Sequence, residues 1–395
     1  MPEWPKVPFV QLAAQGKSSF SIGPFGSAIT KENYVAHGVP VVRGINLARG
    51  IFHDDEFVYI TEGKADELAN ANLAPGDLVF THRGTIGQVS MIPRVPRFSR
   101  YVLSSSQVKA RLDESLTIPE FYFYWFRSPV GQHTLLANAS TVGVPGIGQP
   151  LATIKSLKVP CPPRLTQEGI ATVLGALNDK IAVNNRIVNT NRELSLCLYR
   201  RSIFNEFKQS TIGQAVTFHN KSRVPLSSRQ RKEFQGPYPY YGANGIVDHV
   251  AEYRFDGDYI LVGEDGSVVT KNGSPVVRHA HGQFWVSNHA HVLSGDAISN
   301  ELLHCALRDS DVRPYVTGAV QPKLSMGNLK KVSIILPLER HRLALEAELG
   351  FLASLALIKS TENQSLAELR DTLLPKLMSG EIKVRDAEKA VEEAV

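Results

Sequence analysis

Residues 75–87 (PGDLVFTHRGTIG) recur as residues 256–268 (DGDYILVGEDGSV), and this repeat decides the fold. Two later blocks repeat in the same order: 103–108 (LSSSQV) with 286–292 (VSNHAHV), and Gln149-Pro150 with Gln321-Pro322. The offset is about 181 residues through the first blocks and 172 at the last pair, because the first copy carries extra residues around 140–148. A period of this length predicts two whole domains rather than a solenoid. We therefore expect a protein that does one job at two places.

The composition is that of an ordinary globular protein. Hydrophobic residues make up 43% and charged residues 21% of the 395 residues, a length that allows two or three domains with their own cores. No apolar run approaches the roughly 20 residues that cross a bilayer, and the opening MPEWPKVPFV does not resemble an export signal. Cys161, Cys197 and Cys305 are isolated, which favours a reducing cytoplasm over a disulfide scaffold. The net charge of +5 is compatible with a polyanionic partner.

Proline, glycine and periodicity divide the chain into five parts. These are a first domain at 1–163, a central long helix at 164–210, a second domain at 211–338, a distal long helix at 339–380, and a frayed or disordered tail at 381–395. The first domain contains short β-type runs at 39–42, 57–60, 77–81 and 88–92. An aromatic segment at 119–127 predicts a buried helix, and 300–307 is its counterpart in the second domain.

Both long helices carry an apolar stripe at alternating steps of three and four residues. The residues expected in this seam are Ile170, Leu174, Leu177, Ile181, Asn184, Val188, Asn191, Leu194, Leu198, Leu345, Leu349, Leu352, Asn363, Leu366, Leu369 and Leu373. Each helix would be about 50–60 Å long. We predict that the two pair as an antiparallel coiled coil, in which the asparagines set the register rather than add stability. The alternative is two unrelated amphipathic helices, each covering its own domain.

The motifs of nucleotide-binding and methyl-transferring enzymes are missing from the sequence. Residues 16–18 (GKS) resemble the end of a phosphate-binding loop, but the earlier glycine of that motif is absent. No Gly-rich strand end suggests adenosylmethionine, and no Asn-Pro-Pro-aromatic motif suggests base flipping. Asp55, Glu62 and Lys64 have the spacing of a nuclease motif, yet a solvated loop is the better interpretation of so charged a segment. We therefore predict no catalytic and no cofactor-binding residues.

Two histidine pairs leave a metal-dependent enzyme open as an alternative. The pairs are His279 with His281, and His289 with His291. Alternate residues of a strand point to one face, so both pairs together could bind a metal. No carboxylate stands at a helpful short distance in the sequence, and the first copy has Ser105 and Gln107 at the places of the second pair. We therefore predict no metal ligands.

Basic residues on predicted loops are the best positive signal. Residues 221–232 (KSRVPLSSRQRK) hold five positive charges and no negative one, and 238–244 (YPYYGAN) follow. Cations for phosphates beside Tyr, Asn and Ser for base edges suit the readout of duplex DNA, although a charge run is usually only a solvated face. The candidate DNA-binding residues are Lys17, Lys31, Arg43, Asn46, Arg49, His82, Arg83, Ser105, Gln107, Lys221, Arg223, Arg229, Arg231, Lys232, Tyr240, Tyr241, Asn244, His289 and Lys323.

With these features, the chain resembles the specificity subunits of type I restriction–modification systems. The matching stretches of the first domain are 23–27 (GPFGS), 40–46 (PVVRGIN) and 76–87, and those of the second are 236–246 (GPYPYYGANGI), 257–266 and 287–293. Residues 373–381 (LLPKLMSGE) resemble the end of the distal helical region. The first helix departs from the family pattern because it is rich in Asn and Arg rather than in acidic residues and Lys.

The resemblance implies an α+β protein with two similar α/β target-recognition domains separated by the paired helices. Each domain would read one half of a split site in double-stranded DNA, and the coiled coil would fix the gap. The subunit itself would not be catalytic. Two adenine methyltransferase subunits would bring S-adenosylmethionine, and motor-nuclease restriction subunits would use ATP and Mg²⁺. A coiled-coil adaptor protein remains a second alternative.

Overall fold

The computed structural model describes residues 4–50, 52–140, 143–318 and 320–394, without the side chains of residues 27 and 48–50. These residues form two compact units. The first unit runs to Ala182 and resumes at Asn363, and the second is Val183–Glu362. Each unit therefore contains one domain of the repeat together with the adjoining parts of two long helices. In the described residues, no helix combines the length and the apolar character needed to cross a membrane.

The two long helices are α5 (Arg164–Ser202) and α10 (Glu339–Ser379). Helix α10 ends one residue before the predicted 380. Gly380, with φ of 71°, terminates it, because glycine adopts the left-handed conformation of a C-terminal cap without strain. The prediction of a central helix to residue 210 is corrected. Helix α5 ends at Ser202. The residues predicted as its last turns instead include β13 (Phe207–Thr211), which pairs antiparallel with β20 (Ser333–Pro337).

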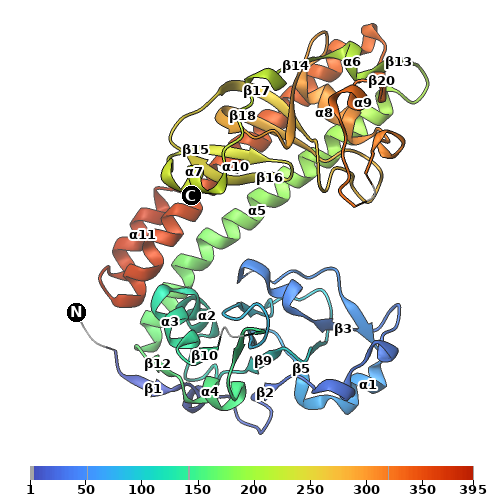
Figure 1. Cartoon of the computed structure of the whole chain (residues 1–395). Coiled ribbons are helices and arrows are strands. Elements are labelled where there is room, and N and C mark those ends of the chain that lie inside the picture. The colour runs from blue at the N-terminus through green and yellow to red at the C-terminus, as the bar shows by residue number, and fades with distance from the viewer. Residues whose placement is uncertain (1–3, 51, 141–142, 319, 395) are drawn as a thin grey trace. The chain divides into compact units, whose positions relative to one another are not determined.

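Helices α5 and α10 pack side by side and antiparallel (Figure 1). In the first unit, Asn363 Nδ2 lies 3.5 Å from the backbone oxygen of Ile181. In the second unit, Asn191 Nδ2 lies 3.4 Å from the backbone oxygen of Leu352. Partners on α10 thus come earlier in the chain as those on α5 come later, which is the expected antiparallel pairing.

Most of the predicted seam lies inward. The buried members are Ile170, Leu174, Leu177, Asn184, Val188, Asn191, Leu345, Leu349, Leu352, Leu366 and Leu373. The half-buried members are Ile181, Leu198, Asn363 and Leu369. Leu194 is a correction: its side chain is 44% exposed. From Asn191 the steps of four and three lead through Ser195 to Leu198, so Leu194 falls outside the stripe.

The same helices also cover the domain cores. Leu174 and Leu373 belong to a cluster with the aromatic residues of α2 (Pro119–Arg127) in the first unit. Leu345 and Leu349 belong to a cluster with α8 (Asn300–Arg308) in the second. The predicted pairing is therefore confirmed. The alternative of two unrelated helices is wrong, because each helix contacts its partner helix and contributes to the cores of both units.

The first domain contains two four-stranded sheets. One has the order β2 (Phe20–Ile22), β9 (Gln107–Ala110), β6 (Leu78–Thr81), β7 (Val89–Met91). The other has the order β4 (Val58–Ile60), β3 (Val39–Val42), β8 (Tyr101–Leu103), β5 (Asn72–Leu73). Strands β3 and β8 are parallel, and the other neighbours are antiparallel. A ribbon of β1 (Lys6–Pro8) and β12 (Lys158–Pro160) precedes α5.

The second domain repeats these pairings in one six-stranded sheet. Its order is β14 (Val216–Phe218), β19 (Ala290–Gly295), β17 (Phe255–Gly263), β18 (Val277–Val286), β15 (Tyr238–Gly242), β16 (Gly245–Val250). Strand β15 is parallel to β18, as β3 is to β8. The long strand β18 takes the places of β7 and β8, which the first domain separates by a loop at 92–100. The duplication inferred from the sequence is therefore a duplication of sheet topology.

One of the predicted equivalences is wrong. Gly84 and Gly266 match, because both have positive φ (85° and 80°), and their amides donate to Pro145 and Pro322 respectively. Gln321-Pro322 therefore corresponds to 144–145, at an offset of 177, and not to Gln149-Pro150. Gln149 instead begins α4 (Pro150–Ser156), whose counterpart is α9 (Met326–Leu329). The prediction matched two Gln-Pro dipeptides that occupy different places in the two domains.

The predicted frayed or disordered tail is also corrected. Residues Val384–Glu392 form helix α11. Ala387 and Val391 are buried in the core cluster of the first unit, which also contains Leu373. Alternating charge and small apolar residues looked like a solvated tail in the sequence, but Ala387, Val391 and the half-buried Val384 form one apolar face that the first unit covers.

Candidate nucleic-acid interface

The topology gathers loops at one end of each domain. In the first domain, parallel β3 and β8 end together, at Val42 and Leu103. Antiparallel pairing sets Thr81, the end of β6, beside Gln107, the start of β9. The loops after β3, after β6 and between β8 and β9 therefore lie at the same sheet end. We call these loops, together with the bridging segment 144–147, the first loop end.

The second domain has an equivalent second loop end. It consists of the loops that follow β15 and β17, the turn between β18 and β19, and the bridging segment 321–324. The basic segment 221–232 joins it, because Arg223 Nη1 donates to the backbone oxygens of Asn288 and Ala290. Segments that are far apart in the sequence thus form one surface in each domain.

Three candidates of the first domain hold the loop end in shape. Asn46 is 1% exposed, accepts from the Arg43 amide and donates to the backbone oxygens of His53 and Asp55. Burial lowers the pKa of His82, whose Nε2 lies 3.2 Å from the Ser105 oxygen. Gln107 is fully buried and bonds the Ser104 hydroxyl. These residues are positioning residues for the loops, and their burial keeps them from bases.

The remaining candidates of the first domain separate by place. Arg83 and Ser105 are exposed on the first loop end, and half-buried Arg43 donates to the Glu56 oxygen beside it. Lys17 is exposed but precedes β2, whose first residue pairs with Ala110 at the far end of β9. The structure therefore does not bring Lys17 to the loop end.

Two further candidates of the first domain stand apart from these. Lys31 is exposed on the short 3-10 helix Lys31–Asn33. The side chain of Arg49 lies outside the described residues. Neither residue is tied to the loop end by a described contact, so both stay predictions.

An open hollow of about 520 Å³ lies on the second loop end. Four candidates line it: Arg231, Tyr240, Asn244 and His289. Ser227, Ser228 and Asn288 line it as well, and sequence reasoning missed them. Both serines lie within the basic run 221–232, and hydroxyl groups among cations were the sequence feature that could have identified them. The lining is mixed, and its hydroxyl, amide and imidazole groups are able to hydrogen-bond a base edge.

Two of the five cations of the basic run, Arg223 and Arg231, form ion pairs within the domain. Arg223 pairs with Glu264 at 2.8 Å, and both side chains are largely buried. Arg231 pairs with Asp248 at 2.9 Å and lies over the Tyr240 ring at 5.2 Å. The Tyr240 hydroxyl accepts from the Leu226 amide. These contacts hold the segment against the sheet, so two of its five positive charges are neutralised within the domain.

Other candidates of the second domain face solvent. Lys221, Arg229, Lys232, Asn244, His289 and Lys323 are exposed. Arg229 makes an exposed pair with Glu233, and His289 lies 2.7 Å from Asp265. Tyr241 is half-buried against Phe284, and burial raises the pKa of its hydroxyl. The exposed set is the part of the prediction that DNA can reach.

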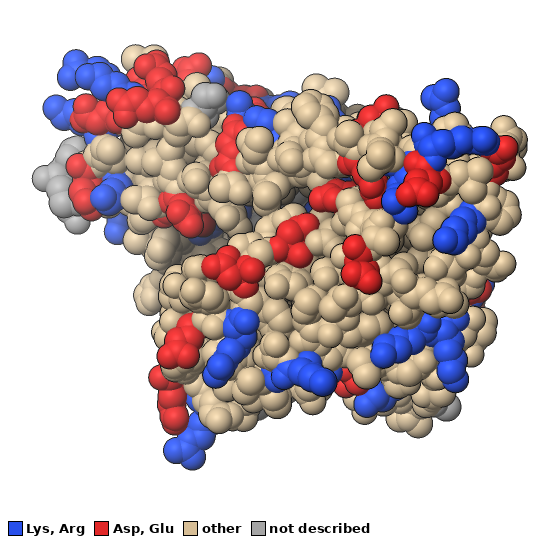
Figure 2. Space-filling view, turned by 90° about the horizontal axis from the view of Figure 1, so that it is seen from above, with Lys and Arg blue, Asp and Glu red and all other residues tan. Residues whose placement is uncertain are grey.

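The two loop ends differ in charge at matched positions. Arg83 and Asp265 each precede the matched glycine and each form the bridge to the segment that follows, Arg83 with Gly146 and Asp265 with Lys323. A cation in one domain thus stands where the other has a carboxylate. Figure 2 draws one face of the molecule, and on it basic and acidic side chains are interspersed with uncharged ones. Contact with a polyanion must therefore come from particular loops, since that face carries mixed charge.

The two histidine pairs do not form one site. His291 is fully buried, its Nε2 lies 2.8 Å from the Leu324 oxygen, and burial lowers its pKa. His289 faces the second loop end. His279 and His281 instead meet Asp258 on a different part of the sheet, which corrects the expectation that no carboxylate is near. The enzyme alternative built on both pairs together is not supported.

The nuclease-like trio is also dispersed. Glu62 pairs with Arg100 at 3.2 Å, and Lys64 pairs with Glu67 at 2.7 Å. The backbone oxygen of Asp55 accepts from Asn46. Among the described residues, these three side chains form no common metal-binding group. The interpretation as a solvated, loop-forming segment therefore holds.

Comparison with known proteins agrees with this geometry. Residues 26–190 and 205–342 both match the type I restriction modification DNA specificity domain. A protein assigned as a type I restriction enzyme specificity subunit of Haemophilus influenzae is 33% identical over 33% of this chain and 34% of its own length. The specificity subunit of the EcoprrI type I restriction enzyme of Escherichia coli is 28% identical over 35% of this chain and 32% of its own length. The matched part is thus about a third of each of these curated relatives.

A solved structure supports the fold over most of the chain. The S subunit of a type I restriction–modification system from M. genitalium aligns with a TM-score of 0.56 at 18% identity, covering 95% of this chain and 96% of that one. The two family matches together span more than half of the chain and coincide with the two copies of the repeat. The chain therefore belongs to the type I restriction–modification DNA specificity family.

Proposed function

We propose that this protein is the DNA-recognition subunit of a type I restriction–modification complex and reads a two-part target in double-stranded DNA. The observation that carries the proposal is a repeated scaffold whose two loop ends present different side chains, as Arg83 and Asp265 illustrate. One scaffold used twice fits one kind of ligand. Different chemistry at matched positions fits two different half-sites.

Binding would combine two kinds of contact. Exposed cations such as Arg83, Lys221 and Lys232 would contact phosphates, which place a domain on the duplex without reading sequence. Asn244 and Ser228 at the hollow would meet base edges, where each good bidentate pair discriminates by about 1–3 kcal/mol. Buried Tyr240 and Asn46 would act indirectly, because they hold the loops that carry those side chains.

The paired helices would act as a spacer. Helix α5 has 39 residues and continues from one unit into the other, a length of about 58 Å at 1.5 Å per residue. Two readers joined by a stiff connection bind together at a higher effective concentration and reject sites with the wrong gap. The buried Asn191 would keep the helices in one register, so that one gap is preferred.

Catalysis would belong to partner subunits. The sequence lacks the motifs for methyl donors and nucleotides, so two adenine methyltransferase subunits would supply S-adenosylmethionine. Restriction subunits would supply ATP- and Mg²⁺-dependent cleavage. Exposed apolar residues of the long helices, including Leu343, Phe351 and Ile358, offer a surface for such partners. The expected location is the cytoplasm.

Exchange of one domain tests the proposal. Residues 211–338 would be replaced by the corresponding domain of another family member, and the methylated target mapped in cells with the partner subunits present. We expect one half of the target to change while the other half and the spacer stay the same. The reciprocal exchange of 1–163 is the matched control and should change the opposite half. Absence of a two-part target for the parent protein, or a change in both halves, would overturn the proposal.

A DNA-binding measurement distinguishes this proposal from the alternative of a coiled-coil adaptor that binds protein. Fluorescence anisotropy of the full chain with random duplex should show affinity that falls by about 10³-fold or more between 50 and 200 mM salt if several phosphates are contacted. An adaptor would give no salt-dependent duplex binding.

A further inference from the structure

The strands β17 and β18 bring three metal-ligating side chains to one face of the second domain. Asp258 is the register partner of His281, and His279 is the partner of Ile260 two residues along. Residues two apart on a strand point to the same face, and so do directly paired residues. The face is the one that α8 covers, since Asn300 of α8 bonds Asp258. The grouping follows from the sheet register, next to the paired glycines Gly257 and Gly282, which both have positive φ.

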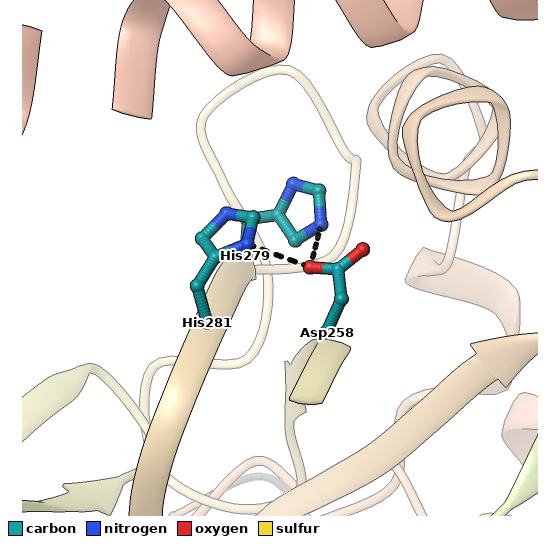
Figure 3. A group of neighbouring side chains, drawn as sticks. All are labelled: Asp258, His279 and His281. Atoms are coloured by element: carbon teal, nitrogen blue, oxygen red, sulfur yellow. Dashed lines mark ion pairs between the residues drawn. The ribbon is translucent and has the colours of Figure 1, made fainter. Parts of the chain in front are cut away.

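The potential ligand atoms converge on a single point. His279 Nε2 lies 2.7 Å and His281 Nδ1 lies 2.8 Å from the same carboxylate oxygen, Asp258 Oδ1. Figure 3 shows both rings directed toward that oxygen. All three ligand atoms lie within 4.8 Å of one another. Among the described residues, the buried Nε2 of His279 has no well-aligned hydrogen-bond partner, although it lies 2.7 Å from Asp258 Oδ1.

Neighbouring groups orient these side chains. Asn300 Nδ2 donates to Asp258 Oδ2 at 2.9 Å and to the Asp258 backbone oxygen at 2.8 Å. That leaves Oδ1 directed at the histidines. The His304 ring of α8 stacks on His279 with centroids 6.0 Å apart and planes 23° apart. Hydrogen bonds and packing behind the ligands are what hold a metal site in one geometry.

We propose that Asp258, His279 and His281 bind one divalent transition-metal ion, of which Zn²⁺ is the best fit. Two imidazole nitrogens and one carboxylate oxygen suit Zn²⁺ and its neighbours in the transition series, whereas Ca²⁺ and Mg²⁺ prefer sites made of oxygen. The side chains of Asp258 and His281 are 41% and 31% exposed, so water can fill a fourth position. The ion would link β17, through Asp258, to β18, through the two histidines. This inference is independent of DNA recognition.

Two features limit the affinity. Ligand atoms around a tetrahedral Zn²⁺ with bonds of about 2.0–2.1 Å lie about 3.3 Å apart, so the present spacing of 2.7 and 2.8 Å must open by about half an ångström. Arg192 and Arg308 also place positive charge near His304. The site is therefore expected to bind less tightly than a closed four-ligand zinc site, and to do so without any folding transition.

The experiment uses the untagged full chain, freed of metal with a chelator. Co²⁺ is titrated and followed by its visible absorption, and Zn²⁺ is then added to displace it. The test variants are His281→Gln and Asp258→Asn. The matched control is His289→Gln, which removes another histidine that contacts a carboxylate in the same domain. We expect one equivalent in the parent and the control, and binding at least 10-fold weaker in both test variants.

A second readout covers variants that do not fold. Reaction of the parent protein with a histidine-modifying reagent, read by mass spectrometry, should show Zn²⁺ protection of His279 and His281 but not of exposed His249. Absence of stoichiometric binding overturns the proposal, as does unchanged affinity in folded His281→Gln or Asp258→Asn. Equal modification of His279 and His281 with and without Zn²⁺ overturns it as well.

Discussion

The side-chain amide of Asn191 on α5 lies 3.4 Å from the backbone oxygen of Leu352 on α10, inside a mostly apolar seam. Asn191 is 8% exposed, and the neighbouring seam residue Val188 is buried. A long contact of this kind stabilises little, but any shift in register would leave the amide without its partner. The contact therefore favours one alignment of the helices.

Replacing this amide should separate stability from register. We expect Asn191→Leu to raise the free energy of unfolding by about 1 kcal/mol, because a buried polar group is exchanged for apolar packing. Urea denaturation of the full chain measures the change. Asn189→Leu makes the same substitution at an exposed position of α5 and should change stability by less than about 0.5 kcal/mol. A clear loss of stability in Asn191→Leu would contradict this view of the seam.

The spacer should respond to the length of the helices. Because Ile181 faces Asn363 and Asn191 faces Leu352, residues 182–188 face 356–362. Deleting both heptads together should keep the seam in phase, shift the preferred gap of the target and leave the half-sites unchanged. Mapping of methylated sites in cells gives the answer. Altered half-sites with an unchanged gap would exclude the helices as the ruler.

The position of a cation in the first domain should decide whether it contributes to DNA binding. Arg83 and Lys17 are both exposed, but Lys17 precedes the far end of the β2–β9 pair. Arg83→Ala should weaken duplex binding and reduce the slope of log K against log salt by about 0.9, the value for one phosphate contact. Lys17→Ala is the control and should leave the slope unchanged in the same anisotropy titration. Equal effects would mean that the loop end is not the DNA-facing surface.

Helix α11 should contribute to the stability of the first unit. Val391 is 7% exposed and packs in its core cluster. Val391→Asp should destabilise that unit by about 3 kcal/mol, because a carboxylate must be buried or the helix must detach. Lys389→Asp adds a carboxylate at an exposed position of the same helix and serves as the control. Similar denaturation midpoints for both variants would show that α11 does not pack as described.

The buried Lys109 should make the first unit more stable as the pH rises above about 8. Burial lowers the pKa of Lys109 to about 8, while its Nζ donates to the Asn72 oxygen at 2.6 Å. Below that pKa the buried ammonium costs stability, and the cost is relieved as pH rises from about 8 toward the unfolded value. Stability of the parent relative to Lys109→Met should therefore rise between pH 8 and 10.5, by at most about 1.4 kcal/mol per pH unit.

Urea denaturation of both proteins at pH 7 and pH 9.5 measures this difference. Lys208→Met is the control, because Lys208 is exposed. A gap between the parent and Lys109→Met that stays constant over this range would mean that Lys109 has the same pKa in the folded and unfolded chains.

The sequence by itself determined the elements whose signals are local. Helix α2 occupies the predicted 119–127, and α10 ends one residue before the predicted 380, because periodicity, proline and glycine act within a few residues along the chain. The repeat likewise predicted two domains of one kind. Buried positions repeat at short steps, so a seam with Leu174 and Leu349 is visible without coordinates.

Tertiary structure alone decided where α5 ends, that the tail forms a helix, and which distant side chains meet. Residues 207–211 became a strand because β20 offered backbone partners, and α11 formed because the first unit offered an apolar surface. Asp258 reached His281 through a strand register that links residues 23 apart, which composition cannot reveal. The charges of the basic run divided between ion pairs and solvent in the same way. Contacts between distant segments depend on how the chain folds in three dimensions. The linear sequence indicates them only where a regular periodicity or an internal repeat is present.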